Sequence, residues 1–164
     1  MKQRLIVVGV DGSAGGRRAL EWALEQARHS DSSVEIVRAW EPPWTEDESD
    51  TTAYEAEKAR VDKELEREVA VALSLHEHRP VVSYELVEGP PVETLVEAAS
   101  AADMLVLGSH GHSHLLTALM GSTSEGCIRG ATCPVVVVPV PIPPEERVRI
   151  PQPARRTQPT SEKA

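Results

Sequence analysis

The residues best suited to chemistry lie between Gly108 and Ser122, a segment that begins where an apolar run ends. Gly108 and Gly111 lack a Cβ atom, so the backbone there can approach a ligand closely and adopt positive φ. Successive amide groups in such a turn can form a concave anion site. Gly121 precedes Ser122, where we expect a helix to begin, and a helix start offers unpaired amides and partial positive charge. These features favour binding of a phosphate group by backbone amides.

Ser122 and Glu125 have the spacing of a capping box, in which each side chain bonds the backbone amide of the other. The same hydroxyl would then lie beside a bound phosphate. The segment is not a Walker A loop, since it contains no Gly-Lys-Ser or Gly-Lys-Thr. Gly9-Val10-Asp11-Gly12 likewise lacks the spacing of a dinucleotide fingerprint. Without a lysine on the phosphates, fast phosphoryl transfer is not expected.

Three alternating histidines, His110, His112 and His114, fall within the same segment. They could ligate a metal, contact phosphate or remain solvated. No carboxylate follows them at matching spacing, so we favour the second and third interpretations and predict no metal site.

The rest of the chain alternates apolar runs with amphipathic stretches, which predicts a parallel sheet between two helix layers. Helical spacing of apolar residues and a cap at Ser13 predict the first helix. Predicted strands span 5–10, 34–40, 81–87, 103–107 and 134–139. Predicted helices span 14–28, 52–77 and 122–129. Another follows the turn Glu88-Gly89-Pro90-Pro91, with a proline at its first position, and carries the stripe Val92, Leu95, Val96 and Ala99.

Composition limits the partners and the compartment. The formal net charge of −9 argues against general binding to nucleic acid, which requires clustered cations. Cys127 and Cys133 are not spaced as CxxC, so two small thiols in a reducing compartment are favoured over a redox pair. The polar start and the lack of a run of about 20 apolar residues predict a cytoplasmic protein without a membrane span. We expect one domain over 1–140 and a disordered, proline-rich tail over 141–164.

Several motifs together resemble the universal stress protein family. Gly108, two residues, Gly111, nine residues and Gly121-Ser122 resemble its ATP-binding signature. The resemblance extends from about Arg4 to Pro139. It also includes the segments Val10-Asp11-Gly12-Ser13, Glu88-Gly89-Pro90-Pro91 and Thr132-Cys133-Pro134-Val135-Val136-Val137-Val138. Two departures are His112, where many members carry a basic residue, and Gly130-Ala131 in place of His-Ala.

The resemblance implies an α/β three-layer sandwich with a five-stranded parallel sheet in the order 3-2-1-4-5. A ligand would then lie where crossovers leave strands one and four in opposite directions. By resemblance the ligand is ATP, with or without Mg²⁺, and strand 135–138 pairs with a second copy in a homodimer. The implied nucleoside contacts are Gly9, Val10, Asp11 and Ala39, and the implied ribose and phosphate contacts are Gly108, Ser109, Gly111, His112, Gly121, Ser122 and Thr123. Asp11 also has an alternative role, that of a turn residue bonding its own backbone.

Three functions remain open. The favoured one is a nucleotide-dependent regulator or sensor of the stress response, which offers a surface to an unidentified protein partner. A slow ATPase would use Asp11 to orient water or magnesium and Ser122 to contact the γ-phosphate, although no general base is evident. A structural module that binds no nucleotide is disfavoured because the glycine segment is complete.

Overall fold

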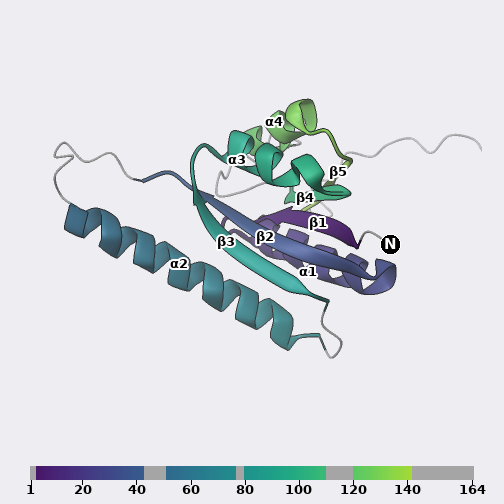
Figure 1. The fold of residues 1–164 in the computed structure, drawn as a ribbon, viewed down its shortest axis with the longest axis horizontal. Helices are drawn as coiled ribbons and strands as arrows, with labels where there is room; N and C mark the ends of the chain where they lie inside the picture. Colours follow the sequence, from purple (N-terminus) through teal and green to yellow (C-terminus); the bar gives the residue numbers. More distant parts are fainter. Residues whose placement is uncertain (1–2, 43–50, 77–79, 110–119, 142–164) are drawn as a thin grey trace, which may run out of the picture.

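A computed structural model describes residues 3–42, 51–76, 80–109 and 120–141. Its centre is one sheet of five parallel strands in the order β3-β2-β1-β4-β5 (Figure 1). The strands are β1 (Arg4–Gly9), β2 (Ser32–Trp40), β3 (Val82–Glu88), β4 (Met104–Gly108) and β5 (Val135–Val138). The expected fold and strand order are therefore confirmed.

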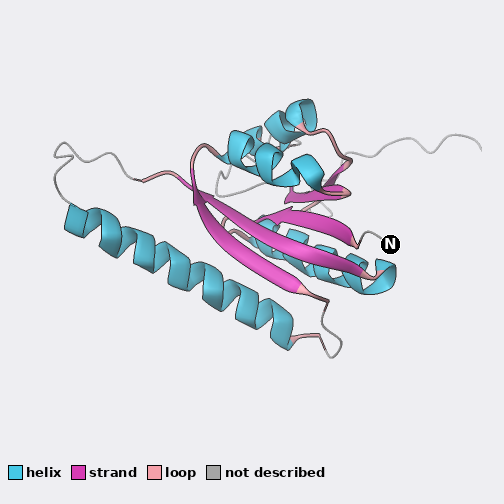
Figure 2. Ribbon diagram, viewed as in Figure 1, coloured by secondary structure: helices cyan, strands magenta, loops and turns pink. Residues whose placement is uncertain are grey.

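Helices cover both faces of the sheet (Figure 2). One face packs against α1 (Ala14–Ser30) and α2 (Thr51–Ser74). The other face packs against α3 (Pro91–Ala98), the short 3₁₀ turn η1 (Ala99–Ala101) and α4 (Ser122–Gly130). None of the helices in the described part of the chain is long and apolar enough to cross a membrane.

The apolar run of β1 shows why the sheet is buried on both sides. Ile6 and Val8 belong to the core cluster beneath α1 and α2, whereas Val7 belongs to the cluster beneath α3 and α4. Successive side chains of a strand point to opposite faces, so a strand between two helix layers has no solvent-facing position to fill with polar residues. The continuous run of β-branched residues is the consequence.

The sequence predicted a specific feature at the start of α1, α3 and α4, and two of these three predictions are confirmed. Ser13 caps α1, since its Oγ accepts the backbone N–H of Gly16 at 3.0 Å. Pro91 is the first residue of α3, as expected for a residue without an amide donor. The third case, α4, differs and is described with the site.

Element boundaries differ from the expected ones by a few residues. β2 begins at Ser32, α1 continues to Ser30, and α2 spans Thr51–Ser74. The C-cap of α1 is Asp31, a non-glycine residue at φ 51° whose amide donates to the carbonyl of Ala27. The left-handed cap closes the helix without the glycine that usually marks such an end.

Candidate functional site

A cavity of about 310 Å³ lies beyond the carboxyl ends of β1 and β4. These two strands are neighbours in the sheet, and the chain leaves them for opposite faces: α1 follows β1 on one side, and α4 follows β4 on the other. This is the switch point at which open α/β sheets bind ligands. The lining comprises Gly9, Val10, Asp11, Gly16, Ala39, Pro91, Leu95, Leu107, Gly108, Gly121, Ser122, Thr123 and Ser124.

Most of the residues predicted from the sequence line this cavity. They are Gly9, Val10, Asp11, Ala39, Gly108, Gly121, Ser122 and Thr123. Gly111 and His112, like His110 and His114, lie outside the described residues. The structure therefore brings together four segments that are distant in the sequence: the ends of β1, β2 and β4 and the start of α4.

Ser109 is placed differently from the other predicted residues. It is buried, and its amide donates to the carbonyl of Val138 at 2.9 Å. Its hydroxyl accepts the amide of Val140 at 3.1 Å, and its carbonyl accepts the amide of Gly121 at 2.7 Å. Ser109 is not part of the lining; it ties β4 to the end of β5 and to the residue before α4.

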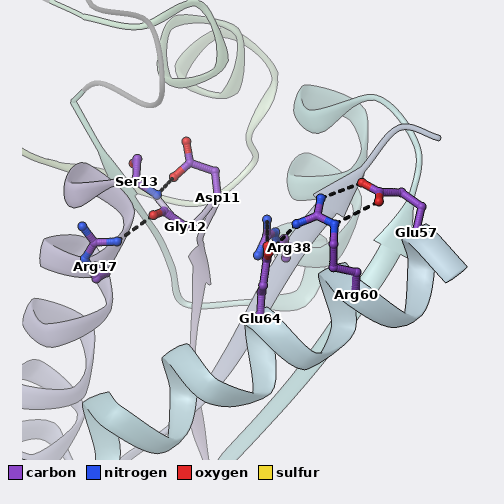
Figure 3. A network of polar contacts seen from close by, with 8 residues as sticks. All are labelled: Asp11, Gly12, Ser13, Arg17, Arg38, Glu57, Arg60 and Glu64. Carbon is purple, nitrogen blue, oxygen red and sulfur yellow. Dashed lines mark hydrogen bonds and ion pairs between the residues drawn. The ribbon is translucent and has the colours of Figure 1, made fainter. Parts of the chain in front are cut away.

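Asp11 braces its own turn and also lies at the cavity. Its carboxylate accepts the Ser13 amide at 2.9 Å, so it braces its own turn (Figure 3). The same side chain lines the cavity. A Cβ atom on Gly16 would lie 2.8 Å from Asp11 Oδ1, so a residue without a side chain is needed there for the carboxylate to keep this position. Gly12 completes the turn at φ 80°.

Gly108 brings β4 into direct contact with α1. A Cβ atom at this position would lie 2.5 Å from the carbonyl carbon of Gly15, far inside the normal contact distance. The carbonyl of Gly108 also accepts the Ser124 hydroxyl at 2.8 Å. The end of β4 thus fixes the first turns of both α1 and α4 around the cavity.

The predicted capping box at α4 is wrong. Gly121 is the N-cap, with φ −74° and ψ 156°, and Ser122 is already the first helical residue. The hydroxyl and the carboxylate are each one position too far along the helix to cap it. Glu125 instead forms an exposed ion pair with Arg129. The acid thus has a partner on the outside of the helix, and no N-cap side chain covers the amides at its start.

The cavity has an apolar part and a polar part. Ala39, Pro91, Leu95 and Leu107 form apolar walls, whereas Ser122–Ser124 contribute hydroxyls at a helix start. Among the described lining residues Asp11 is the one charged side chain. An apolar slot beside a helix N-terminus suits a molecule with a flat base at one end and phosphate at the other.

Sequence reasoning missed five lining residues: Gly16, Pro91, Leu95, Leu107 and Ser124. Leu107 is the penultimate residue of β4, and Pro91 starts the helix after β3. Their position at the carboxyl edge of the sheet could therefore have been predicted from where the strands end in the sequence. Leu95 was identified only as a core residue, because periodicity does not distinguish a core contact from a cavity wall.

The two cysteines offer no alternative chemistry. Both thiols are free, and burial raises the pKa of Cys127 to about 11 and also raises the pKa of Cys133. A reactive cysteine needs the opposite shift. Residues 3–42, 51–76, 80–109 and 120–141 contain no cluster of three His, Cys, Asp or Glu side chains that could hold a metal ion.

Comparison with known proteins agrees with this architecture. A universal stress protein from Mycobacterium tuberculosis is 34% identical over 152 residues, which cover 84% of this chain and 48% of that protein. The chain spans about half the length of the curated relatives it matches. UspA from Lactobacillus plantarum shares the fold with a TM-score of 0.71 at 21% identity, covering 84% of this chain and 99% of that one. A universal stress protein crystallised in complex with cAMP has a TM-score of 0.63 at 26% identity, covering 84% of this chain and 98% of that one. The model of the universal stress protein family matches residues 3–139, and the chain belongs to that family.

Proposed function

We propose that this chain binds ATP in the cavity beyond β1 and β4 and acts as a nucleotide-dependent regulator or sensor in the stress response. The observation that carries the proposal is the convergence of Asp11, Ala39 and the start of α4 on one cavity at the switch point of the sheet. Asp11 follows β1, Ala39 lies near the end of β2, and α4 follows β4, so each would contribute a different part of a nucleotide site.

The adenine would occupy the apolar part of the cavity. Ala39, Pro91 and Leu95 all line it, and the small side chain of Ala39 leaves room for a ring. Leu107 lies with Leu95 over Gly9, where both would be within 3.0 Å of an added Cβ atom. The 26% identical relative crystallised with cAMP supports an adenine nucleotide as the ligand class.

The phosphates would lie at the start of α4. The amides of the first turn have no partners within the helix, and the helix dipole favours negative charge there. The hydroxyls of Ser122 and Thr123 add donors on the same side of the cavity. Magnesium, when bound with the nucleotide, would offset phosphate charge, and the Asp11 carboxylate is a suitable oxygen ligand for it.

Regulation is favoured over catalysis because the described lining contains no convincing general base. Asp11 already accepts the Ser13 amide and serves the turn. A slow ATPase at the same site is the alternative. It predicts steady release of phosphate that stops in Asp11→Ala, whereas a sensor retains intact ATP.

The test is equilibrium binding of ATP to the purified chain by calorimetry, with Ser122→Asp and Ser122→Asn as a matched pair. The added carboxylate would lie roughly 5 Å from a phosphate and weaken binding by about 2 kcal/mol, or roughly thirtyfold. An acid at a helix start does not harm the helix, so the variant stays folded. The neutral isostere should bind within a few-fold of the parent. No saturable binding by the parent, or equal binding by both variants, refutes the proposal.

We propose in addition that the protein forms a homodimer through strand 135–138. Within the described sheet β5 is an edge strand, paired to β4 on one side, and Val135, Val136 and Val137 are only partly buried. An exposed apolar edge needs cover, and a second copy supplies it. Sedimentation of Val137→Lys as a monomer beside a dimeric parent would support this. We also propose a cytoplasmic location, because ATP is available there.

A further inference from the structure

A second cavity of about 330 Å³ lies on the face of the sheet covered by α1 and α2. We call it the α1–α2 groove; Leu20 and Glu21 of α1 form one wall, and Val71, Ala72 and Leu75, at the end of α2 and just beyond it, form the other. The proposed nucleotide site does not use any of these residues.

The two ends of the groove differ in polarity. Near the carboxyl edge of the sheet, Arg38 of β2 pairs with Glu64 of α2 at 3.4 Å, and Arg60 bridges Glu64 and Glu57 (Figure 3). Further along, Val71 is 56% exposed and Leu75 is 67% exposed. Two large apolar side chains are thus left in solvent beside a hollow, which is the signature of a contact surface.

We propose that residues 147–151 of the same chain, Arg-Val-Arg-Ile-Pro, dock in the α1–α2 groove. The first argument is where the described chain ends. The carbonyl of Pro139 accepts Nε of Arg18 at 3.2 Å, and the amide of Val140 is held by Ser109. The chain therefore departs alongside α1, the helix that forms one wall of the groove, and Arg18 is adjacent to the groove residue Arg17.

The second argument is length. A helix with its side chains is about 10–12 Å across. Residues 142–146, Ile-Pro-Pro-Glu-Glu, span about 15 Å in the extended conformation that proline favours, at about 3.1 Å per residue. The path over such a helix is half its circumference, about 16–19 Å. The six steps from Pro141 to residue 147 span about 19 Å at the same rise, so residue 147 can reach the groove.

The third argument is the pattern of side chains. In an extended segment Val148 and Ile150 point to one side, while Arg147 and Arg149 point to the other. The apolar pair matches Val71 and the neighbouring apolar wall of the groove. The groove itself is balanced in charge, because Glu21, Glu64 and Glu68 line it together with Arg17, Arg38 and Arg67. The attraction of the cationic pair therefore comes from the formal net charge of −9 of the whole protein. Residues 147–156 contain four arginines and no acidic residue.

Trypsin digestion of the full chain tests the proposal, because the segment carries its own cleavage sites. Cleavage after Arg147 and Arg149 is compared with cleavage after Arg155 and Arg156, each normalised to the free peptide 142–164. Proteolysis proceeds from the undocked population, so a segment docked about 80% of the time is cut about fivefold more slowly. Mass spectrometry of the early products gives the four rates.

Val71→Asp provides the disrupting variant, and Ala70→Asp provides its control. Both positions are exposed on α2, so neither substitution removes core packing, but only Val71 lines the groove. Protection of Arg147 and Arg149 should vanish in Val71→Asp and persist in Ala70→Asp. Equal normalised rates at all four sites of the parent overturn the proposal, as does protection that survives Val71→Asp. Protection that grows with protein concentration also overturns it and assigns the groove to a second copy.

Discussion

Replacing Gly108 with alanine tests how closely β4 and α1 must approach to form the site. The added Cβ would lie 2.5, 2.6 and 3.0 Å from the carbonyl carbon, the carbonyl oxygen and the Cα of Gly15. Carbon atoms in contact are normally separated by about 3.5–4.0 Å, so the two backbones must move apart by about 1 Å.

The loss in the free energy of unfolding depends on whether side chains or backbone must move to make room for the Cβ atom. Overpacking of a core usually costs about 1–3 kcal/mol, because side chains can rotate away. Here the obstacle is backbone at the first turn of α1, a helix fixed by fully buried residues such as Leu20 and Leu24. Alanine recovers about 0.5–1 kcal/mol of conformational entropy relative to glycine in a strand. We therefore expect a net loss of about 2–3 kcal/mol in the free energy of unfolding.

Urea unfolding measures this loss, and Gly130→Ala is its control. A Cβ on Gly130 would lie 3.2 Å from Val96 Cγ2, the end of a side chain rather than backbone. Alanine also improves helix propensity by about 1 kcal/mol, so that variant should stay within about 0.5 kcal/mol of the parent. A Gly108→Ala protein as stable as the parent, with unchanged ATP affinity, would refute the proposed close approach.

Three further substitutions and modifications have defined outcomes. Leu65→Ala, at a fully buried position of α2, should lower the free energy of unfolding by about 2–5 kcal/mol in the same urea assay; a smaller loss would mean that α2 packs loosely. The pKa of the Cys127 thiol is raised to about 11 by burial and by the charge of Glu93, so iodoacetamide at pH 8 should label it slowly in the native protein and quickly in urea, and rapid native labelling would contradict this. Burial, with the charge of Glu85 second, raises the pKa of Glu35 above 4.5, so the fold loses stability as the pH rises through that value. Glu35→Gln should therefore stabilise the protein at pH 7 but not at pH 3, as thermal unfolding at the two pH values will show.

The sequence predicted the fold because its strongest signals are also the most local. Ile6, Val7 and Val8 are apolar in succession, and only a strand covered on both faces explains that run. Strand order came instead from the family resemblance, since nothing in the composition of β4 states that it lies beside β1. The boundary errors, such as β2 beginning at Ser32, arise because serine is equally acceptable in a strand end and in a turn.

The site was harder to predict in detail because it depends on single-residue registers. Asp11 and Ala39 line the cavity, as their positions at the ends of β1 and β2 predict. Ser109 lies outside the lining, since successive residues after β4 point to different neighbours and its hydroxyl accepts the amide of Val140. Walls such as Leu95 carry no polar signal, so only the packed structure separates them from the core.

The failed capping box explains how the start of α4 suits an anion. Had Ser122 been the N-cap, its hydroxyl would have bonded one of the free amides, and Glu125 would have placed a carboxylate at the same end. Gly121 takes the N-cap position instead, and Glu125 pairs with Arg129 away from the cavity. Glycine at an N-cap costs only a few tenths of a kcal/mol relative to serine. The helix therefore loses little stability, while its first amides and the Ser122 hydroxyl stay available on the cavity side. A one-residue shift in register thus leaves uncapped the helix start at which we propose that phosphate binds.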